Sequence, residues 1–239
     1  MTISSTMKVR DVVLELPQAT RVFEKLKIDY CCGGDTPLGE ACATAGIEVA
    51  NLERMLEEVG RAPGNGSLDF AKTTLGELIG HILDKHHVYT KEEMARLEPL
   101  IEKVISAHGE NHPELRSLGG LFQQLCADLR PHMFKEEQIL FPYILEMETS
   151  ALQNRPAPFA PFGTVNNPIR MMMMEHETVG DLLRELRALS SSYTVPPDGC
   201  ISYQTLYQAL EAFEKDLHQH IHLENNILFP RAIELEGSR

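Results

Sequence analysis

The chain has 239 residues, of which 43% are hydrophobic and 24% charged, and its formal net charge is −13. This acidic excess argues against nucleic acid or an anionic membrane as the main partner, and no apolar run reaches the length of a membrane span. The first residues lack the apolar core of a signal peptide, and five cysteines at irregular spacing do not form a secreted disulfide framework, so we expect a cytoplasmic protein.

Residues 1–60 predict a small helical domain. Apolar residues recur at helical spacing on both sides of Pro17, and two further short helices are expected at 38–45 and 49–59. Between these segments, Cys31-Cys32-Gly33-Gly34 forms a tight turn with two adjacent thiols. The spacing is not the Cys-x-x-Cys of zinc sites. The two thiols are therefore either structural or a redox-active or metal-handling pair.

A linker rich in Gly, Pro and Ser is expected at 61–72, and residues 73–239 predict four long helices. Thr74 and Glu77 indicate a capping box at the first helix, and Asn167-Pro168 indicates the start of the third. Pro131 should kink the second helix. Short loops make each pair of helices an antiparallel hairpin, and a proline-rich crossover at 150–166 joins the hairpins. The expected helices span about 73–107, 114–147, 167–189 and 201–235.

One motif occurs twice among these helices. His132 and Glu136 are followed by Ile-Leu-Phe-Pro, and 88 positions later His220 and Glu224 are followed by the same four residues. Positions four apart project from the same face of a helix, so each histidine and its glutamate can reach one point in space.

A histidine precedes each copy at nearly the same distance. His87 lies 45 residues before His132, and His176 lies 44 residues before His220. Two hairpins related by a pseudo-twofold axis would bring all four histidines and the two glutamates together in the bundle core. Imidazoles with two shared carboxylates suit a pair of mid-row transition metals such as iron.

Several neighbours of these residues carry alternative interpretations. His86 adjoins His87 but projects about 100° away around the helix. His218 and His222 lie on the opposite side of the helix from His220, and we interpret them as surface residues or as residues behind the ligands.

Two other groups also remain open to more than one interpretation. The run Met171–Met174 is interpreted as adaptable core packing, because a thioether prefers a softer metal. Glu137 and Glu175, each next to a candidate ligand, are either surface residues or further carboxylates for a metal or a proton path.

Together these motifs resemble the Repair of Iron Centers family of iron–sulfur cluster repair di-iron proteins. Tyr30-Cys31-Cys32-Gly33-Gly34 is similar to that family's N-terminal domain, and the two His/Glu blocks are similar to its hemerythrin-like domain. The resemblance implies an all-α protein, with a hemerythrin-like four-helix bundle preceded by a small helical Cys-containing domain. It also implies two non-haem iron ions with an oxo or hydroxo bridge. The implied terminal ligands are His87, His132, His176 and His220, and the implied bridging ligands are Glu136 and Glu224.

The resemblance further implies repair of iron–sulfur clusters damaged by nitrosative or oxidative stress, through a supply of iron. Expected partners are damaged iron–sulfur cluster proteins and small ligands such as NO or O2, without nucleic acid or membrane, and the protein is expected to be a monomer or homodimer. Cys31 and Cys32 are candidates for redox chemistry or metal handling. The alternatives are a nitric oxide reductase at the di-iron site and a hemerythrin-like sensor module that binds O2 or NO.

Overall fold

The computed structural model describes residues 3–61, 70 and 72–238, so most of the linker expected at 61–72 lies outside the described residues. The described part is helical, with one isolated β-bridge between Lys8 and Pro37, and the predicted all-α fold is confirmed. The chain divides into two compact units, Met1–Thr74 with His218–Arg231, and Leu75–Leu217 with Ala232–Arg239.

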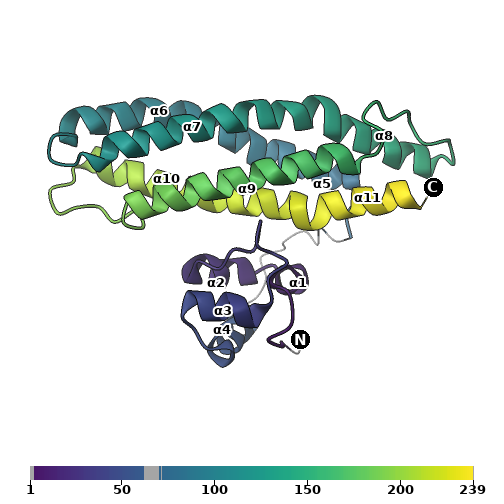
Figure 1. Ribbon diagram of the computed structural model, residues 1–239, viewed down its shortest axis with the longest axis horizontal. Coiled ribbons are helices and arrows are strands. Elements are labelled where there is room, and N and C mark those ends of the chain that lie inside the picture. The colour runs from purple at the N-terminus through teal and green to yellow at the C-terminus, as the bar shows by residue number, and fades with distance from the viewer. Residues whose placement is uncertain (1–2, 62–69, 71, 239) are drawn as a thin grey trace. The chain divides into compact units, whose positions relative to one another are not determined.

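The N-terminal part of the first unit consists of four short helices around a small apolar core (Figure 1). Both short helices expected from the sequence are present, and the second runs on to Arg61. Gly46 ends one of them in the left-handed region, at φ 68°, which glycine adopts without strain. The helices are α1 (Val9–Glu15), α2 (Ala19–Leu26), α3 (Leu38–Ala45) and α4 (Val49–Arg61).

The four long helices are present, but three of them contain a π-helical turn. In the second unit α6 packs on α7 and α7 on α9, and these helices lie side by side in Figure 1. The first hairpin contains α5 (Leu75–His81), η1 (Ile82–His87), α6 (Val88–His108), α7 (Glu114–Lys135), η2 (Glu136–Leu140) and α8 (Phe141–Leu152). The second contains α9 (Asn166–Leu189), α10 (Ile201–Leu223), η3 (Glu224–Leu228) and α11 (Phe229–Gly237).

Close packing joins the helices of the second unit. At Gly119, an added Cβ would lie 3.0 Å from Ile105 Cδ1 and 3.2 Å from Ile101 Cγ2, so glycine allows α7 to approach α6 closely. Arg187 of α9 donates to the buried carboxylate of Glu214 in α10 at 2.9 Å. The core therefore depends on both small residues and a buried ion pair.

Glutamates from other helices cap the starts of α5 and α9. The backbone amides of Leu75 and Gly76 donate to the Glu148 carboxylate at 2.7 and 2.9 Å. The amide of Val165 donates to Glu236 at 2.9 Å. Helix α9 begins at Asn166, so the predicted cap at Asn167 is wrong, because a carboxylate from α11 meets the helix start instead.

The interpretation of Met171–Met174 as core packing is wrong for three of the four side chains. Met172 is buried, whereas Met171, Met173 and Met174 are 52%, 40% and 60% exposed, because the run circles α9 and only one position faces inward. In the described part of the chain, none of the helices combines the length and apolar character that crossing a bilayer requires.

Candidate metal centre

The six residues predicted as metal ligands are buried and close together. Their ligand atoms form two groups, and within each group all of them lie within 4.8 Å of one another. Glu136 and Glu224 occur in both groups and are each 0% exposed. One group adds His87 and His220 to the two glutamates, and the other adds His132 and His176.

The Nε2 atoms of three of the histidines lie near the carboxylates. Glu136 Oε2 lies 3.5 Å from His87 Nε2 and 3.3 Å from His132 Nε2. His132 Nε2 and His176 Nε2 are 3.0 Å apart. On the last helix, His220 Nε2 lies 3.0 Å from Glu224 Oε1. One carboxylate oxygen of Glu136 thus faces a histidine from each of the two groups of ligand atoms.

The three π-helical turns carry residues of this cluster. His87 is the last residue of η1, and Glu136 and Glu224 are the first residues of η2 and η3. In η2 and η3 the amide of the following phenylalanine donates to the glutamate carbonyl five residues before it. Such turns concentrate at functional sites.

The repeated Ile-Leu-Phe-Pro motif lies at these turns. Pro142 and Pro230 have no amide to donate, so each removes one α-helical hydrogen bond at the end of a π-turn. Pro131, where the sequence predicts a kink, lies inside α7, and the π-turn begins only at Glu136.

Carboxylates from neighbouring helices hold two of the histidines on the side away from the cluster. His87 Nδ1 lies 2.7 Å from Glu137 Oε1, which also accepts a hydrogen bond from Lys91 at 2.5 Å. A carboxylate accepts from a protonated Nδ1, so this contact turns Nε2 toward Glu136, where it could bind a metal. The surface interpretation of Glu137 is therefore wrong.

The second contact of this kind joins α7 to α9. His132 Nδ1 lies 2.8 Å from Glu175 Oε2, and Lys135 donates to the other oxygen of the same carboxylate. The surface interpretation of Glu175 is wrong for the same reason. The histidine bond, with help from Lys135, lowers the pKa of Glu175. Burial raises the pKa of Glu137, but the bonds from Lys91 and His87 outweigh it and hold that pKa below its usual value.

His86 takes a different role from His87. Its Nδ1 lies 3.1 Å from both oxygens of Asp216 in α10, and His86 belongs to neither group of ligand atoms. His87, which the 89-residue offset from His176 favours, is the histidine that faces Glu136.

The donor set fits a pair of mid-row metal ions. Four imidazoles and two carboxylates, without a thiolate, are ligands that iron accepts. Glu136 and Glu224 are fully buried, and burying two carboxylates so close together is costly without a cation to compensate them. The residues present therefore suit bound metal.

Comparisons with known proteins agree with this geometry. The hemerythrin HHE cation binding domain matches residues 78–232, and a domain of unknown function (DUF542) matches residues 5–60. A probable iron-sulfur cluster repair protein of Haemophilus influenzae is 33% identical over 227 residues, which is 95% of this chain and 96% of that protein. The chain belongs to the family of iron–sulfur cluster repair proteins. The iron-sulfur cluster repair protein YtfE of Yersinia pseudotuberculosis is 34% identical over 222 residues, 93% of this chain and 94% of its own length.

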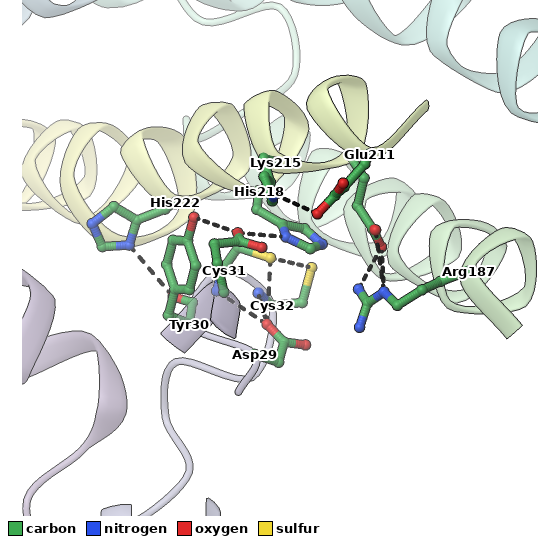
Figure 2. A network of polar contacts seen from close by, with 11 residues as sticks. Asp29, Tyr30, Cys31, Cys32, Arg187, Glu211, Lys215, His218 and His222 are labelled. Carbon is green, nitrogen blue, oxygen red and sulfur yellow. Dashed lines mark hydrogen bonds and ion pairs between the residues drawn. The ribbon is translucent and has the colours of Figure 1, made fainter. Parts of the chain in front are cut away.

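The cysteine turn of this family member is built around Asp29. Its Oδ1 accepts the backbone amides of Cys31 and Cys32 at 3.0 Å each, and it lies 3.3 Å from Cys31 Sγ (Figure 2). A Cβ at Gly33 would lie 3.2 Å from Asp29 Cγ, so glycine lets the carboxylate approach. Cys31 is buried and Cys32 partly exposed. The neighbouring thiol, burial and Asp29 together raise the pKa of Cys31 well above its usual value.

His218 and His222 lie against this turn within the first unit of the repair protein. His218 Nδ1 lies 2.8 Å from Glu24 Oε1, which also accepts the Tyr30 hydroxyl at 3.0 Å. His222 is 5% exposed and packs edge-on against the Tyr30 ring at 5.6 Å, and burial lowers its pKa to about 4. Figure 2 shows both histidines beside Tyr30. The surface interpretation is therefore wrong for His222, which is buried, whereas His218 is partly exposed.

Proposed function

We propose that this protein repairs iron–sulfur clusters damaged by nitrosative or oxidative stress, by supplying iron from a di-iron site. The observation that carries the proposal is the sharing of Glu136 and Glu224 by the two groups of ligand atoms. The relatives named as iron–sulfur cluster repair proteins match nearly the whole chain, which supports the same role here. In this proposal His87 and His220 hold one iron and His132 and His176 the other, with the two glutamates and an oxo or hydroxo group as bridges.

Each ligand has a definite task at such a site. The histidines present Nε2 to the metal, and Glu137 and Glu175 fix the orientation of His87 and His132. Carboxylate and imidazole ligands can hold iron in both the ferrous and the ferric state. Because these ligands are oxygen and nitrogen atoms, the sulfur ligands of a damaged cluster can compete for the iron.

The partners in this proposal are proteins with damaged iron–sulfur clusters, and the compartment is the cytoplasm. All five cysteines are free thiols, as in proteins of reducing compartments. The formal net charge of −13 also suits a carrier of cations, because it repels neither ferrous iron nor a basic partner.

The test combines metal analysis with repair. Protein purified without oxygen should contain two iron ions per chain, with a Mössbauer spectrum of coupled high-spin iron. Mixed with a dehydratase whose [4Fe–4S] cluster nitric oxide has damaged, and with sulfide and a reductant present, it should restore dehydratase activity. Glu136→Ala should abolish both iron loading and repair, whereas Glu146→Gln, an exposed glutamate on α8, should leave both unchanged.

Two outcomes contradict the proposal. One is protein without iron after anaerobic purification and reconstitution. The other is iron-loaded protein that restores no cluster but reduces nitric oxide rapidly to N2O with an electron donor.

A further inference from the structure

The two copies of the repeated motif differ on one face of the helix. At this face the first copy has an exposed Phe134 (62%) and the second a buried His222 (5%). All four residues of the second copy at this face contact the N-terminal part of their own unit. They are His218, His222, Asn225 and Asn226, and 88 positions earlier stand Arg130, Phe134, Glu137 and Gln138.

The two asparagines hold the backbone of the cysteine turn. Asn226 Nδ2 donates to the carbonyls of Tyr30 at 3.1 Å and Cys31 at 3.3 Å, and Asn225 Nδ2 donates to the Cys31 carbonyl at 3.4 Å. A Cβ at Gly34 would lie 3.0 Å from Asn226 Oδ1, so the second glycine of the turn makes room for this contact. Asn225 and Asn226 directly follow Glu224 in η3.

The peptide bond between the two cysteines is the point of contact. Cys31 Sγ and Cys32 Sγ are 3.9 Å apart, and a disulfide needs about 2.0 Å. Joining them closes a ring whose only backbone link is this peptide. Its carbonyl accepts both asparagines and its amide donates to Asp29. Adjacent Cα atoms are only about 3.8 Å apart, less than the usual Cα–Cα span of a disulfide, so closing the ring strains this peptide and the hydrogen bonds that it makes with the asparagines.

We propose that Cys31 and Cys32 form a thiol–disulfide switch that small disulfides oxidise, and that its closure releases Asn225 and Asn226 and loosens the η3 turn carrying Glu224. The effect on iron rests on the proposed function. The oxidised protein gives up iron faster, so oxidative stress itself starts the release of iron.

The reaction is ordinary thiol–disulfide exchange. The more exposed Cys32 attacks a small disulfide as a thiolate, forms a mixed disulfide and expels one small thiolate. Cys31 sulfur then attacks Cys32 sulfur, its proton passes through Asp29 to solvent, and the second small thiolate leaves. Two protein thiols are oxidised, and one small disulfide is reduced to two thiols.

The first measurement uses apo-protein, so it does not depend on iron. Cys200 is exposed, and its contact with His108 and the start of α10 lowers its pKa to about 7, so the experiment uses a Cys200→Ser background. Glutathione disulfide should remove two hydrogen masses from the peptide that contains Cys31 and Cys32. Amide hydrogen exchange across 224–229 should then rise by about two- to tenfold, as the loss of one or two hydrogen bonds predicts.

Variants separate the switch from general damage to the fold. Asn226→Ala removes two of the three asparagine hydrogen bonds, so its reduced form should exchange faster than the reduced parent, and oxidation should add a smaller increase than in the parent. Gln138→Ala changes the equivalent position of the first copy and should leave the response to oxidation intact. Cys31→Ser and Cys32→Ser should each abolish the response.

The iron-loaded protein gives the second measurement. Oxidation should speed the transfer of iron to a ferrous chelator by a similar factor in the parent and by a smaller factor in Asn226→Ala. If no internal disulfide forms, or if it forms and amide exchange across 224–229 does not change, the proposed switch is contradicted. If the switch works in apo-protein that never binds iron, the proposed function fails and the switch stands.

Discussion

His87 and His132 are each held at Nδ1 by a carboxylate from another helix, and each carboxylate binds a lysine one turn further along the helix of its histidine. A metal at Nε2 depends on such contacts, because they fix the tautomer and the direction of the ring. The lysines keep the carboxylates charged and therefore good acceptors.

We expect Glu175→Gln to weaken iron binding by about 10- to 100-fold, the usual effect of removing a carboxylate behind a histidine ligand. The amide carries no charge and gives His132 a weaker acceptor. Iron affinity is measured by anaerobic competition with a ferrous chelator, and the visible spectrum should shift as well. Glu177→Gln, an exposed neighbour on α9, is the matched control. Equal affinities for the two variants would contradict this role of Glu175.

Spacing along the chain pointed to residues that the structure brings into one buried cluster, but not to the contacts around that cluster. His132 and Glu136 stand out because a helix places both on one face and because the motif recurs. Glu137 and Glu175 have no such signal, since each histidine partner lies on a different helix. A comparison of the two copies of the motif carries one signal for such contacts. Asn225 and Asn226 replace Glu137 and Gln138, and that change marks the face turned to the cysteine turn.

At the scale of elements, the two hairpins share equivalent helix-capping residues as well as equivalent candidate ligands. Glu148 caps α5, and Glu236, 88 positions later, caps α9. Each lies six residues after the proline of its Ile-Leu-Phe-Pro motif. Periodicity predicted the long helices well. It could not predict the π-turns, because one additional residue per turn alters the apolar pattern too little over five or six positions.

Glu148→Gln should lower the free energy of unfolding by about 0.5–2 kcal/mol, the range for loss of a helix cap. The carboxylate accepts two amides at the start of α5 and also carries the charge that a helix N-terminus favours. Urea unfolding followed by circular dichroism gives the value. Glu146→Gln, on the same helix and exposed, should change it little. The same loss in both variants would rule out a specific capping role.

Gly119→Val should destabilise the bundle by about 1–3 kcal/mol, as expected for overpacking. Its side chain would meet Ile101 and Ile105 where α6 and α7 touch. Gly120→Val makes the same chemical change at the next residue, where nothing lies within 4 Å of an added Cβ. The difference between the two urea midpoints isolates the packing cost. No difference would show that the helices can separate freely at this point.

At the scale of the whole molecule, the buried carboxylates of the cluster should make the stability of the folded protein depend on bound metal. The predicted domain limits at 1–60 and 73–239 stay a prediction, and the compact unit of Met1–Thr74 also takes in His218–Arg231. The long helix that contains His220 and Glu224 thus serves both the ligand cluster and the cysteine turn. Sequence reasoning assigned that helix to the bundle alone, because contacts between distant segments leave no periodic signal.

Ferrous iron should raise the Tm of the apo-protein, because a ligand that binds only the folded state stabilises it. It should also offset the cost of burying Glu136 and Glu224. Differential scanning calorimetry without oxygen measures the shift, and a chelator should reverse it. Glu136→Gln should show no such shift, while Glu146→Gln should behave as the parent. An iron-induced rise that survives in Glu136→Gln would place the metal elsewhere.

Each group of ligand atoms takes one histidine and one glutamate from each hairpin, and exchanging the hairpins exchanges the groups. A single hairpin paired with its own copy would therefore assemble the same six side chains around a true symmetry axis. In such a dimer every mutation occurs twice. A chain that carries both hairpins is free of that constraint, so one hairpin holds His87 with Glu137 while the matching position of the other, Asn225, contacts the cysteine turn.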